Sequence, residues 1–348
     1  LSVAAVIDGF TIKGGNANES GSISYQLKIY NNGDGGGMLN HASSPTLTNT
    51  TFLYNTASVN GGGIYNRTSS SPIITNTTLS YNTAVDDGGG MYNISSSPTI
   101  TNSIFWENLK NGSNSVPGAD IKDVSPPTSP PTVSYCLTQA SSDYSFGTGI
   151  INNQDPLFVD AANGDFSLQG CSPAINTGTA TNAPTTDILG NPRVGIVDMG
   201  AYEYQGTKVE ITVSAPTVTQ LTCIVSTGEI IVNATTTTGT LEYSIDDGAT
   251  YQASNTFSGL AAGNYTISVR EQGSSCTETY SSNPVVINTP VIITVSAPTV
   301  TQPTCTVSTG EIIVNASTTT GTLEYSIDNG TSYQSSNTFS GLAGGNYI

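Results

Sequence analysis

Short β-prone segments, separated by Gly, Ser-Pro and Asn, recur along the first third of the chain. Three units align: GGGMLNHASSPTLTNTTFLYN from Gly35, GGGIYNRTSSSPIITNTTLSYN from Gly61 and GGGMYNISSSPTITNSIFWEN from Gly88. Their starts lie 26 and 27 residues apart, and their apolar positions stay in register. Self-similarity at a fixed period is typical of a stacked repeat. A disordered tract has no reason to keep such columns, so we predict a folded region.

Five columns of equivalent residues run through the three units, three of them apolar and two of Asn. They are Met38, Ile64 and Met91; Leu47, Ile74 and Ile100; Phe52, Leu79 and Phe105; Asn49, Asn76 and Asn102; and Asn55, Asn82 and Asn108. This pattern predicts a parallel β-helix whose coils rise by about 4.8 Å. The apolar columns would fill the interior. Stacked Asn amides would hydrogen-bond one another at turns, so we expect both Asn columns to be structural.

After the three aligned units we expect further, less regular coils up to residue 153. The pattern of the sequence changes beyond that residue. The strand PTVSYCLTQ (131–139) favours reading the Pro-rich loop at 125–131 as an excursion from one coil. Residues 154–205 then predict a cap, because a β-helix has an open last coil that must be covered. Arg193 lies close in sequence to three acidic residues, and we expect a structural ion pair there. These residues are Asp187, Asp198 and Glu203.

A longer repeat follows, in which TVSAPTVTQ from Thr212 recurs from Thr294, an offset of 82 residues. Alternating segments such as EIIVNA and TLEYSI, with Gly and Asp-Gly turns between them, predict antiparallel Ig-like sandwiches at 206–290 and 291–348. The second copy stops at GLAGGNYI, so we expect it to be truncated. We likewise expect coils that precede Leu1. All-β is the predicted class.

The amino-acid composition excludes some classes of binding partner. Only 9% of the residues are charged, 25 acidic against 8 basic, and the net charge is −17. Nucleic acid and anionic membranes are bound through cationic side chains, so both are poor partners. No stretch of 18 apolar residues could cross a bilayer as a helix.

Several segments resemble known families. The coils resemble right-handed β-helix repeats of bacterial surface proteins, and GGGIYN with the following Asn is similar to the polymorphic outer-membrane protein repeat. DPLFVDAANGDFSLQGCSPAINTG and DILGNPRVGIVDMGAYEY resemble the C-terminal segment of choice-of-anchor proteins. The 82-residue unit resembles the SprB-type repeat of gliding-motility adhesins of Bacteroidetes. Together these resemblances imply a secreted, extracellular cell-surface adhesin.

The five cysteines fit this organisation. Cys223 and Cys276 lie in the complete sandwich, and Cys305 is the counterpart of Cys223. We predict a Cys223–Cys276 disulfide, which would stabilise the fold by roughly 4 kcal/mol on the chain-entropy view. Whether Cys136 pairs with Cys171 is left open by the sequence. Disulfides indicate an exported protein.

Candidate chemistry is sparse in the coils. Asp34, Asn60 and Asp87 each precede a GGG, so they should stack in one column. Asp34 and Asp87 would then lie roughly 10 Å apart, near the spacing of an inverting glycosidase pair. Asp-Gly and Asn-Gly are also ordinary turn pairs, which we favour. Asp34, Asp86 and Asp87 remain weak calcium candidates; we expect no other cofactor and no catalytic residue.

The five basic residues of the coil region give a lyase little support, because they are scattered and form no column through the coils. They are Lys13, Lys28, Arg67, Lys110 and Lys122. The single histidine, His41, is replaced by Arg67 and Ile94 in the next two units, so a catalytic triad or histidine metal site has no support.

Aromatic residues are the better lead for binding. Tyr65 and Tyr92 should stack, as should Tyr54 and Tyr81, and Trp106 is the only tryptophan. Rows of Tyr on a flat β face can stack on sugar rings, although they can equally cover the sheet or face inward.

We therefore expect a non-enzymatic adhesin or stalk protein that binds an extracellular polysaccharide or another surface. One alternative is a polysaccharide lyase or glycoside hydrolase whose groove lies on the coils. A second is a purely structural filament or surface-layer protein.

Overall fold

The computed structural model describes residues 5–18, 22–25, 28–31, 33–124, 130–139 and 147–348. The chain divides into two compact units, Leu1–Glu210 and Ile211–Ile348. The fold is all-β, as predicted: the described residues form strands and one short 3₁₀ helix, η1 (Ala161–Asn163). In this part of the chain no helix has the length and apolar character needed to cross a membrane.

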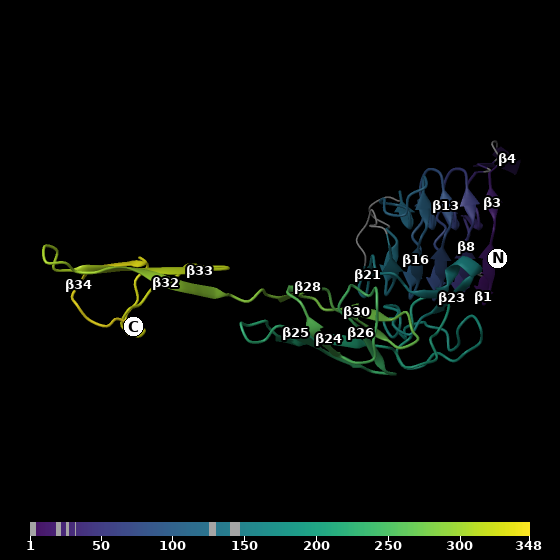
Figure 1. Ribbon diagram of the computed structural model, residues 1–348. Helices are drawn as coiled ribbons and strands as arrows, with labels where there is room; N and C mark the ends of the chain where they lie inside the picture. Colours follow the sequence, from purple (N-terminus) through teal and green to yellow (C-terminus); the bar gives the residue numbers. More distant parts are fainter. Residues whose placement is uncertain (1–4, 19–21, 26–27, 32, 125–129, 140–146) are drawn as a thin grey trace. The chain divides into compact units, whose positions relative to one another are not determined.

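The first unit is a parallel β-helix built from four stacked sheets, named here after one strand of each (Figure 1). The β7 sheet holds β1 (Val6–Asp8), β7 (Thr46–Thr48), β11 (Ile73–Thr75), β15 (Thr99–Thr101) and β19 (Thr132–Ser134). The β8 sheet holds β2 (Thr11–Lys13), β8 (Thr51–Leu53), β12 (Thr78–Ser80), β16 (Ile104–Trp106), β20 (Leu137–Thr138) and β21 (Ile151–Asn152). The β9 sheet holds β3 (Asn16–Ala17), β9 (Thr56–Ala57), β13 (Thr83–Ala84) and β17 (Leu109–Lys110). The β10 sheet holds β6 (Met38–His41), β10 (Ile64–Arg67), β14 (Met91–Ile94) and β18 (Ile121–Asp123).

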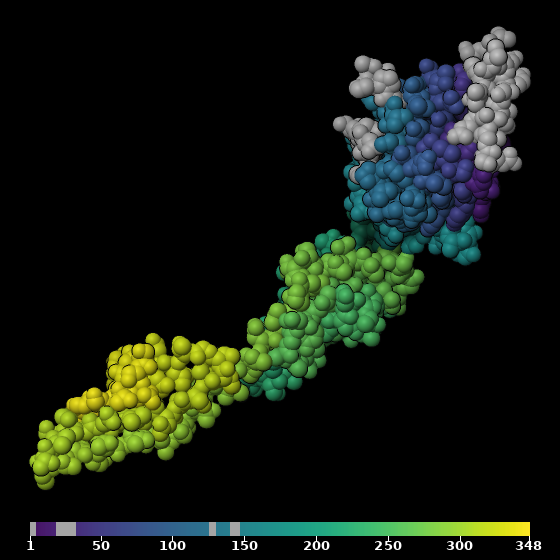
Figure 2. Space-filling view, turned by 90° about the horizontal axis from the view of Figure 1, so that it is seen from above, coloured from purple at the N-terminus to yellow at the C-terminus, as the bar shows by residue number. Residues whose placement is uncertain are grey.

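The apolar columns predicted from the sequence are confirmed. Ile64 pairs in parallel register with Met38 and Met91, Ile74 with Leu47 and Ile100, and Leu79 with Phe52 and Phe105. Together they form most of one buried cluster in the interior of the coils. In the space-filling view these coils follow one another without a break from purple to blue (Figure 2).

Glycine is needed in the triple-glycine segments for two separate physical reasons. Gly61 has a left-handed φ of +69°, which favours glycine. Gly62 is required by close approach, because a Cβ there would lie 2.5 Å from the carbonyl oxygen of Gly89 and 2.4 Å from that of Thr83. The segment therefore turns the chain once and then lets neighbouring coils touch through their backbones.

The segment predicted as a cap contacts more of the β-helix than its last coils. Besides the last coils, it contacts earlier ones along one side of the β-helix, through hydrogen bonds that reach back to Asn49. Its apolar residues pack on the β8 sheet, in a cluster that includes Ile104, Leu137 and Met199. We call residues 155–204 the side segment. It contains the antiparallel pair β22 (Phe158–Asp160) and β23 (Asp165–Leu168). The remaining strands of this unit are β4 (Ser22–Tyr25) and β5 (Lys28–Asn31), which form an antiparallel pair.

The second unit holds two copies of the 82-residue repeat. The first contains β24 (Ile211–Thr219), β25 (Gly228–Thr236), β26 (Leu241–Ser244), β27 (Thr256–Leu260), β28 (Gly263–Tyr265), β29 (Ser268–Glu271), β30 (Thr277–Thr279) and β31 (Val285–Ile287). These antiparallel strands enclose a core that includes Ile230, Val232 and Val269. The second contains β32 (Ile293–Thr301), β33 (Gly310–Thr318) and β34 (Thr338–Leu342), which form one antiparallel sheet.

The predicted Cys223–Cys276 disulfide is wrong. Cys223 is an exposed free thiol whose Sγ donates to the carbonyl oxygen of Val291 at 3.0 Å, whereas Cys276 is buried and disulfide-bonded. Cys171 is also disulfide-bonded, and Cys136 is free, so Cys136 does not pair with Cys171. Burial raises the pKa of the Cys136 thiol to about 12. A disulfide in the chain indicates an oxidising, extracytoplasmic compartment.

Candidate functional site

The first candidate region is the row of Asn49, Asn76 and Asn102, which connects the β7 and β8 sheets. All three have left-handed φ values between +47° and +51°, as expected for Asn at a turn. Their amides serve mainly as a docking row for the side segment. Asn49 donates to the carbonyl oxygen of Thr186 at 3.0 Å, Asn76 to Asp198 at 2.9 Å and Asn102 to Thr179 at 2.8 Å. Within the row, one direct hydrogen bond joins two of the side chains, from Asn102 Nδ2 to Asn76 Oδ1 at 3.2 Å.

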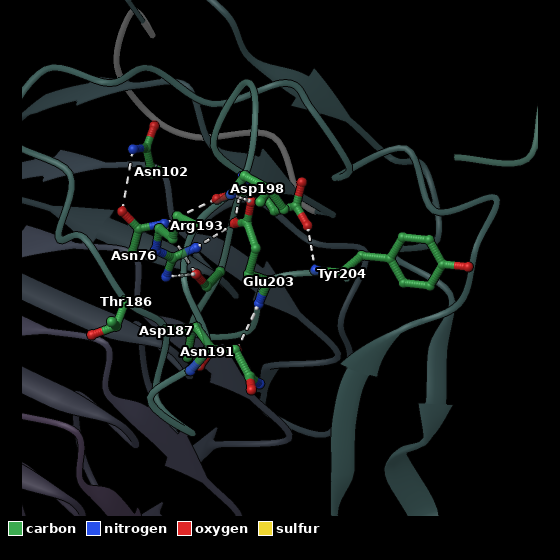
Figure 3. A network of polar contacts seen from close by, with 12 residues as sticks. Asn76, Asn102, Thr186, Asp187, Asn191, Arg193, Asp198, Glu203 and Tyr204 are labelled. Atoms are coloured by element: carbon green, nitrogen blue, oxygen red, sulfur yellow. Dashed lines mark hydrogen bonds and ion pairs between the residues drawn. The ribbon is translucent and has the colours of Figure 1, made fainter. Parts of the chain in front are cut away.

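Arg193 joins this row to the acidic residues of the side segment (Figure 3). Its Nη1 lies 2.8 Å from Glu203 Oε2, and both side chains are almost fully buried, at 3% and 1% exposed. Its Nη2 donates to Asn49 Oδ1 at 2.9 Å. The structural ion pair predicted from the sequence is confirmed.

The neighbouring carboxylates accept backbone amides. Asp198 accepts from the amides of Asn176 and Tyr204, each at 2.7 Å, and Glu203 accepts from the amides of Val194 and Asp198, each at 3.0 Å. Asp187 does the same, accepting amides that include Leu189 at 2.9 Å. With their oxygens committed to closing loops, these groups form a structural network.

Asp198 makes this network sensitive to pH. Burial raises its pKa to about 6, the nearby Glu203 carboxylate adds to the rise, and amide hydrogen bonds and Arg193 oppose it. A raised folded-state pKa means that its stabilising contribution is complete below the ordinary value of 3.8 and is lost as the pH rises through about 6. We expect wild-type protein to gain stability over Asp198→Asn as the pH falls through this window, measured by chemical denaturation of both. A difference that stays constant would contradict this assignment.

Asn55, Asn82 and Asn108 form the predicted continuous ladder. Asn55 Nδ2 donates to Asn82 Oδ1 at 2.9 Å, and Asn82 Nδ2 donates to Asn108 Oδ1 at 3.0 Å, with all three side chains fully buried. A second ladder was not predicted, although its signal is the Asn three residues after each GGG. It comprises Asn40, Asn66 and Asn93, joined by two bonds of 2.8 Å.

The carboxylate column before the triple glycines is stacked as expected, but its members are engaged. Asn60 and Asp87 form a parallel bridge. Asp34 is buried and accepts from the backbone amide and side chain of Asn60 at 3.2 and 3.4 Å, and burial raises its pKa. Asp87 is ion-paired with Lys110, at 2.5 Å between Oδ1 and Nζ. Asp86 is exposed. Among the described residues no three His, Cys, Asp or Glu side chains are grouped so that they could hold a metal ion.

Tyr65 and Tyr92 stack on the outer side of the β10 sheet. Their ring centroids lie 5.2 Å apart with parallel planes, so the ring faces are turned toward each other along the stack. Leu39 flanks Tyr65 in register on the other side. Tyr65 is only 6% exposed, and its burial and the nearby Asp34 raise its pKa to about 12. Lys122 flanks Tyr92 in register on the far side, so a sugar ring can approach only the edges of this stack.

Tyr54, Tyr81 and Trp106 lie against the side segment. Tyr54 and Tyr81 stack at 5.1 Å, and both meet Phe166 edge-on; the Tyr54 hydroxyl also donates to the carbonyl oxygen of Ala161 at 2.7 Å. Trp106 packs against the apolar cluster that includes Met199. Of the two alternatives for this Tyr pair, the structure thus shows rings packed against the side segment rather than a free row.

Comparison with known proteins agrees with the coil geometry. Residues 8–155 match a family model described as "Right handed beta helix region". The coils are a right-handed β-helix region. No curated protein and no solved structure matches the chain.

Proposed function

We propose that this protein is a non-enzymatic cell-surface protein that contacts an extracellular polysaccharide or another surface through its β-helix. The observation that carries the proposal is the engagement of the candidate catalytic carboxylates. Asp34 is bonded to Asn60, and Asp87 is paired with Lys110. A hydrolase needs one carboxylic acid and one carboxylate free to face the substrate. In this chain these groups stabilise the stack instead.

The resemblance of two parts of the chain to known families supports the proposal that this protein is an adhesin. The side segment is similar to the C-terminal segment of choice-of-anchor proteins, and the 82-residue repeats are similar to SprB-type repeats of gliding Bacteroidetes. An oxidising compartment, indicated by the disulfide, is compatible with export to the cell surface. The edges of the Tyr65–Tyr92 stack are the proposed contact with a glycan.

The full chain should bind glycans on an array, or a cell surface, without turning over acidic or neutral polysaccharides. Tyr92→Ala should weaken glycan binding, whereas Asp34→Asn and Asp87→Asn should leave it unchanged. Asp86→Ala is the matched control, because it removes the same charge from the exposed neighbour of Asp87.

Turnover that is lost in Asp34→Asn or Asp87→Asn, but kept in Asp86→Ala, would establish the enzyme alternative instead. Blank glycan arrays together with end-to-end assembly of purified particles would establish the structural-filament alternative.

A further inference from the structure

Three of the eight basic residues of the chain gather on one side of the β-helix, around the stacked tyrosines of the β10 sheet. Arg67 belongs to β10, and Lys122 belongs to β18 of the same sheet. Lys110 reaches this side through its ion pair with Asp87, the residue that precedes the glycines before β14. In a chain with 25 acidic residues, this group of cations is a local departure from a strongly negative surface.

Arg67 is the arginine whose charge is not used within the protein. Arg193 pairs with Glu203 and Arg270 pairs with Glu242, whereas Arg67 forms no ion pair among the residues that the structure describes. Its side chain is partly exposed on the outer side of β10. A planar guanidinium without a paired carboxylate can bind an incoming one through two parallel N–H···O bonds.

The edge of the Tyr65–Tyr92 stack adds two further donors. Both rings point outward, because the preceding residues Ile64 and Met91 point into the interior. In the part of the chain that the structure describes, neither Tyr hydroxyl makes a hydrogen bond. Burial raises the pKa of Tyr65 to about 12, a rise that the nearby charge of Arg67 opposes, and burial also raises the pKa of Tyr92. Both hydroxyls therefore stay protonated at neutral pH and can donate.

We propose that Arg67 and these two tyrosine hydroxyls bind an anionic group of an acidic polysaccharide, the carboxylate of a uronic acid. This inference rests on the proposed function, since it names the class of glycan that the edges of the stack contact. The guanidinium pairs with the carboxylate, and the hydroxyls donate to its remaining lone pairs or to the sugar hydroxyls beside it. The net charge of −17 disfavours contact with an anionic polymer elsewhere on the chain, so binding is confined to this side.

Titration calorimetry of the full chain with polygalacturonate, and with the same polymer after its carboxylates are reduced to alcohols, tests the proposal. We expect tighter binding of the polyuronate, with a difference that shrinks as the salt concentration rises. Arg67→Gln should weaken binding of the polyuronate about tenfold and leave binding of the reduced polymer unchanged. Tyr92→Phe keeps the ring but removes one donor, so it should also weaken binding of the polyuronate. Lys13→Gln is the matched control, because it removes the same charge from the β8 sheet.

Arg67→Lys gives a further readout, because it keeps the charge without the forked geometry and should recover only part of the lost affinity. Equal affinity of the wild-type chain for the two polymers, or an unchanged affinity of Arg67→Gln for the polyuronate, would overturn this inference. The proposed function would survive that result if Tyr92→Ala still weakened binding of neutral glycans. Binding of neither polymer together with a blank glycan array would remove the proposed function, and this inference with it.

Discussion

Replacing Arg193 with glutamine is expected to lower the free energy of unfolding of the first unit by about 3 to 5 kcal/mol. The substitution removes the cation from a buried pair and leaves the Glu203 carboxylate, 1% exposed, without its counter-charge. It also breaks the bond from Arg193 to Asn49, which ties the side segment to the coils. Chemical denaturation measures the loss, and faster proteolysis within residues 155–204 would locate it.

Lys208→Gln is the matched control. Lys208 and Glu210 form an ion pair in the same unit, but their side chains are 25% and 63% exposed and the charged atoms lie 3.7 Å apart. Exposed pairs of this kind contribute little, so we expect a loss of about 0.5 kcal/mol or less. Equal losses in the two variants would show that the buried pair does not hold the side segment.

Asn82→Ala is expected to lower the free energy of unfolding by about 4 kcal/mol, because it interrupts the ladder at its central rung. Asn82 donates to the carbonyl oxygen of Phe52 at 2.8 Å and accepts from the backbone amide of Asn55 at 3.1 Å. Both groups lie in the interior, and each buried group left without a partner costs about 1 to 3 kcal/mol. The deleted side chain would also leave a cavity. Thermal and chemical denaturation would measure the effect.

Two further variants separate hydrogen bonding from packing. Asn82→Asp keeps the side-chain volume but replaces the Nδ2 donor with an acceptor facing Phe52 and Asn108, so it should cost at least as much as Asn82→Ala. Asn18→Ala, at an exposed position, should change the free energy of unfolding by about 0.5 kcal/mol or less. A small effect of Asn82→Asp would mean that packing, rather than the ladder, dominates.

Regular stacking made much of the fold predictable. Once a coil of 26 or 27 residues is assumed, residues one period apart must be neighbours, so the columns through Ile64, Ile74 and Leu79 follow directly. The Asn82 ladder follows for the same reason. The ion pair of Arg193 was also foreseeable, because it is one of only eight basic residues and lies among acidic ones in sequence.

Other features depend on contacts that no period relates. Arg193 bonds Asn49 across 144 residues of sequence, and this contact places the side segment along the coils. The same segment brings Phe166 against Tyr81, which residue type alone could not show. The Cys223–Cys276 prediction failed similarly, since matching cysteines between repeats says which positions are equivalent and not which thiols meet.

The sequence by itself determined the coil period, the interior columns and the all-β class, because in a stack each residue's neighbour is its own counterpart one unit away. Only the tertiary structure decided which faces are covered and which side chains remain accessible. Tyr81 makes the point most directly: its register in the coils places its ring on Tyr54, and Phe166 of the side segment then packs against it. The physical reason is that no repeat relates Phe166 to the coils, so its position depends on how the side segment folds against them.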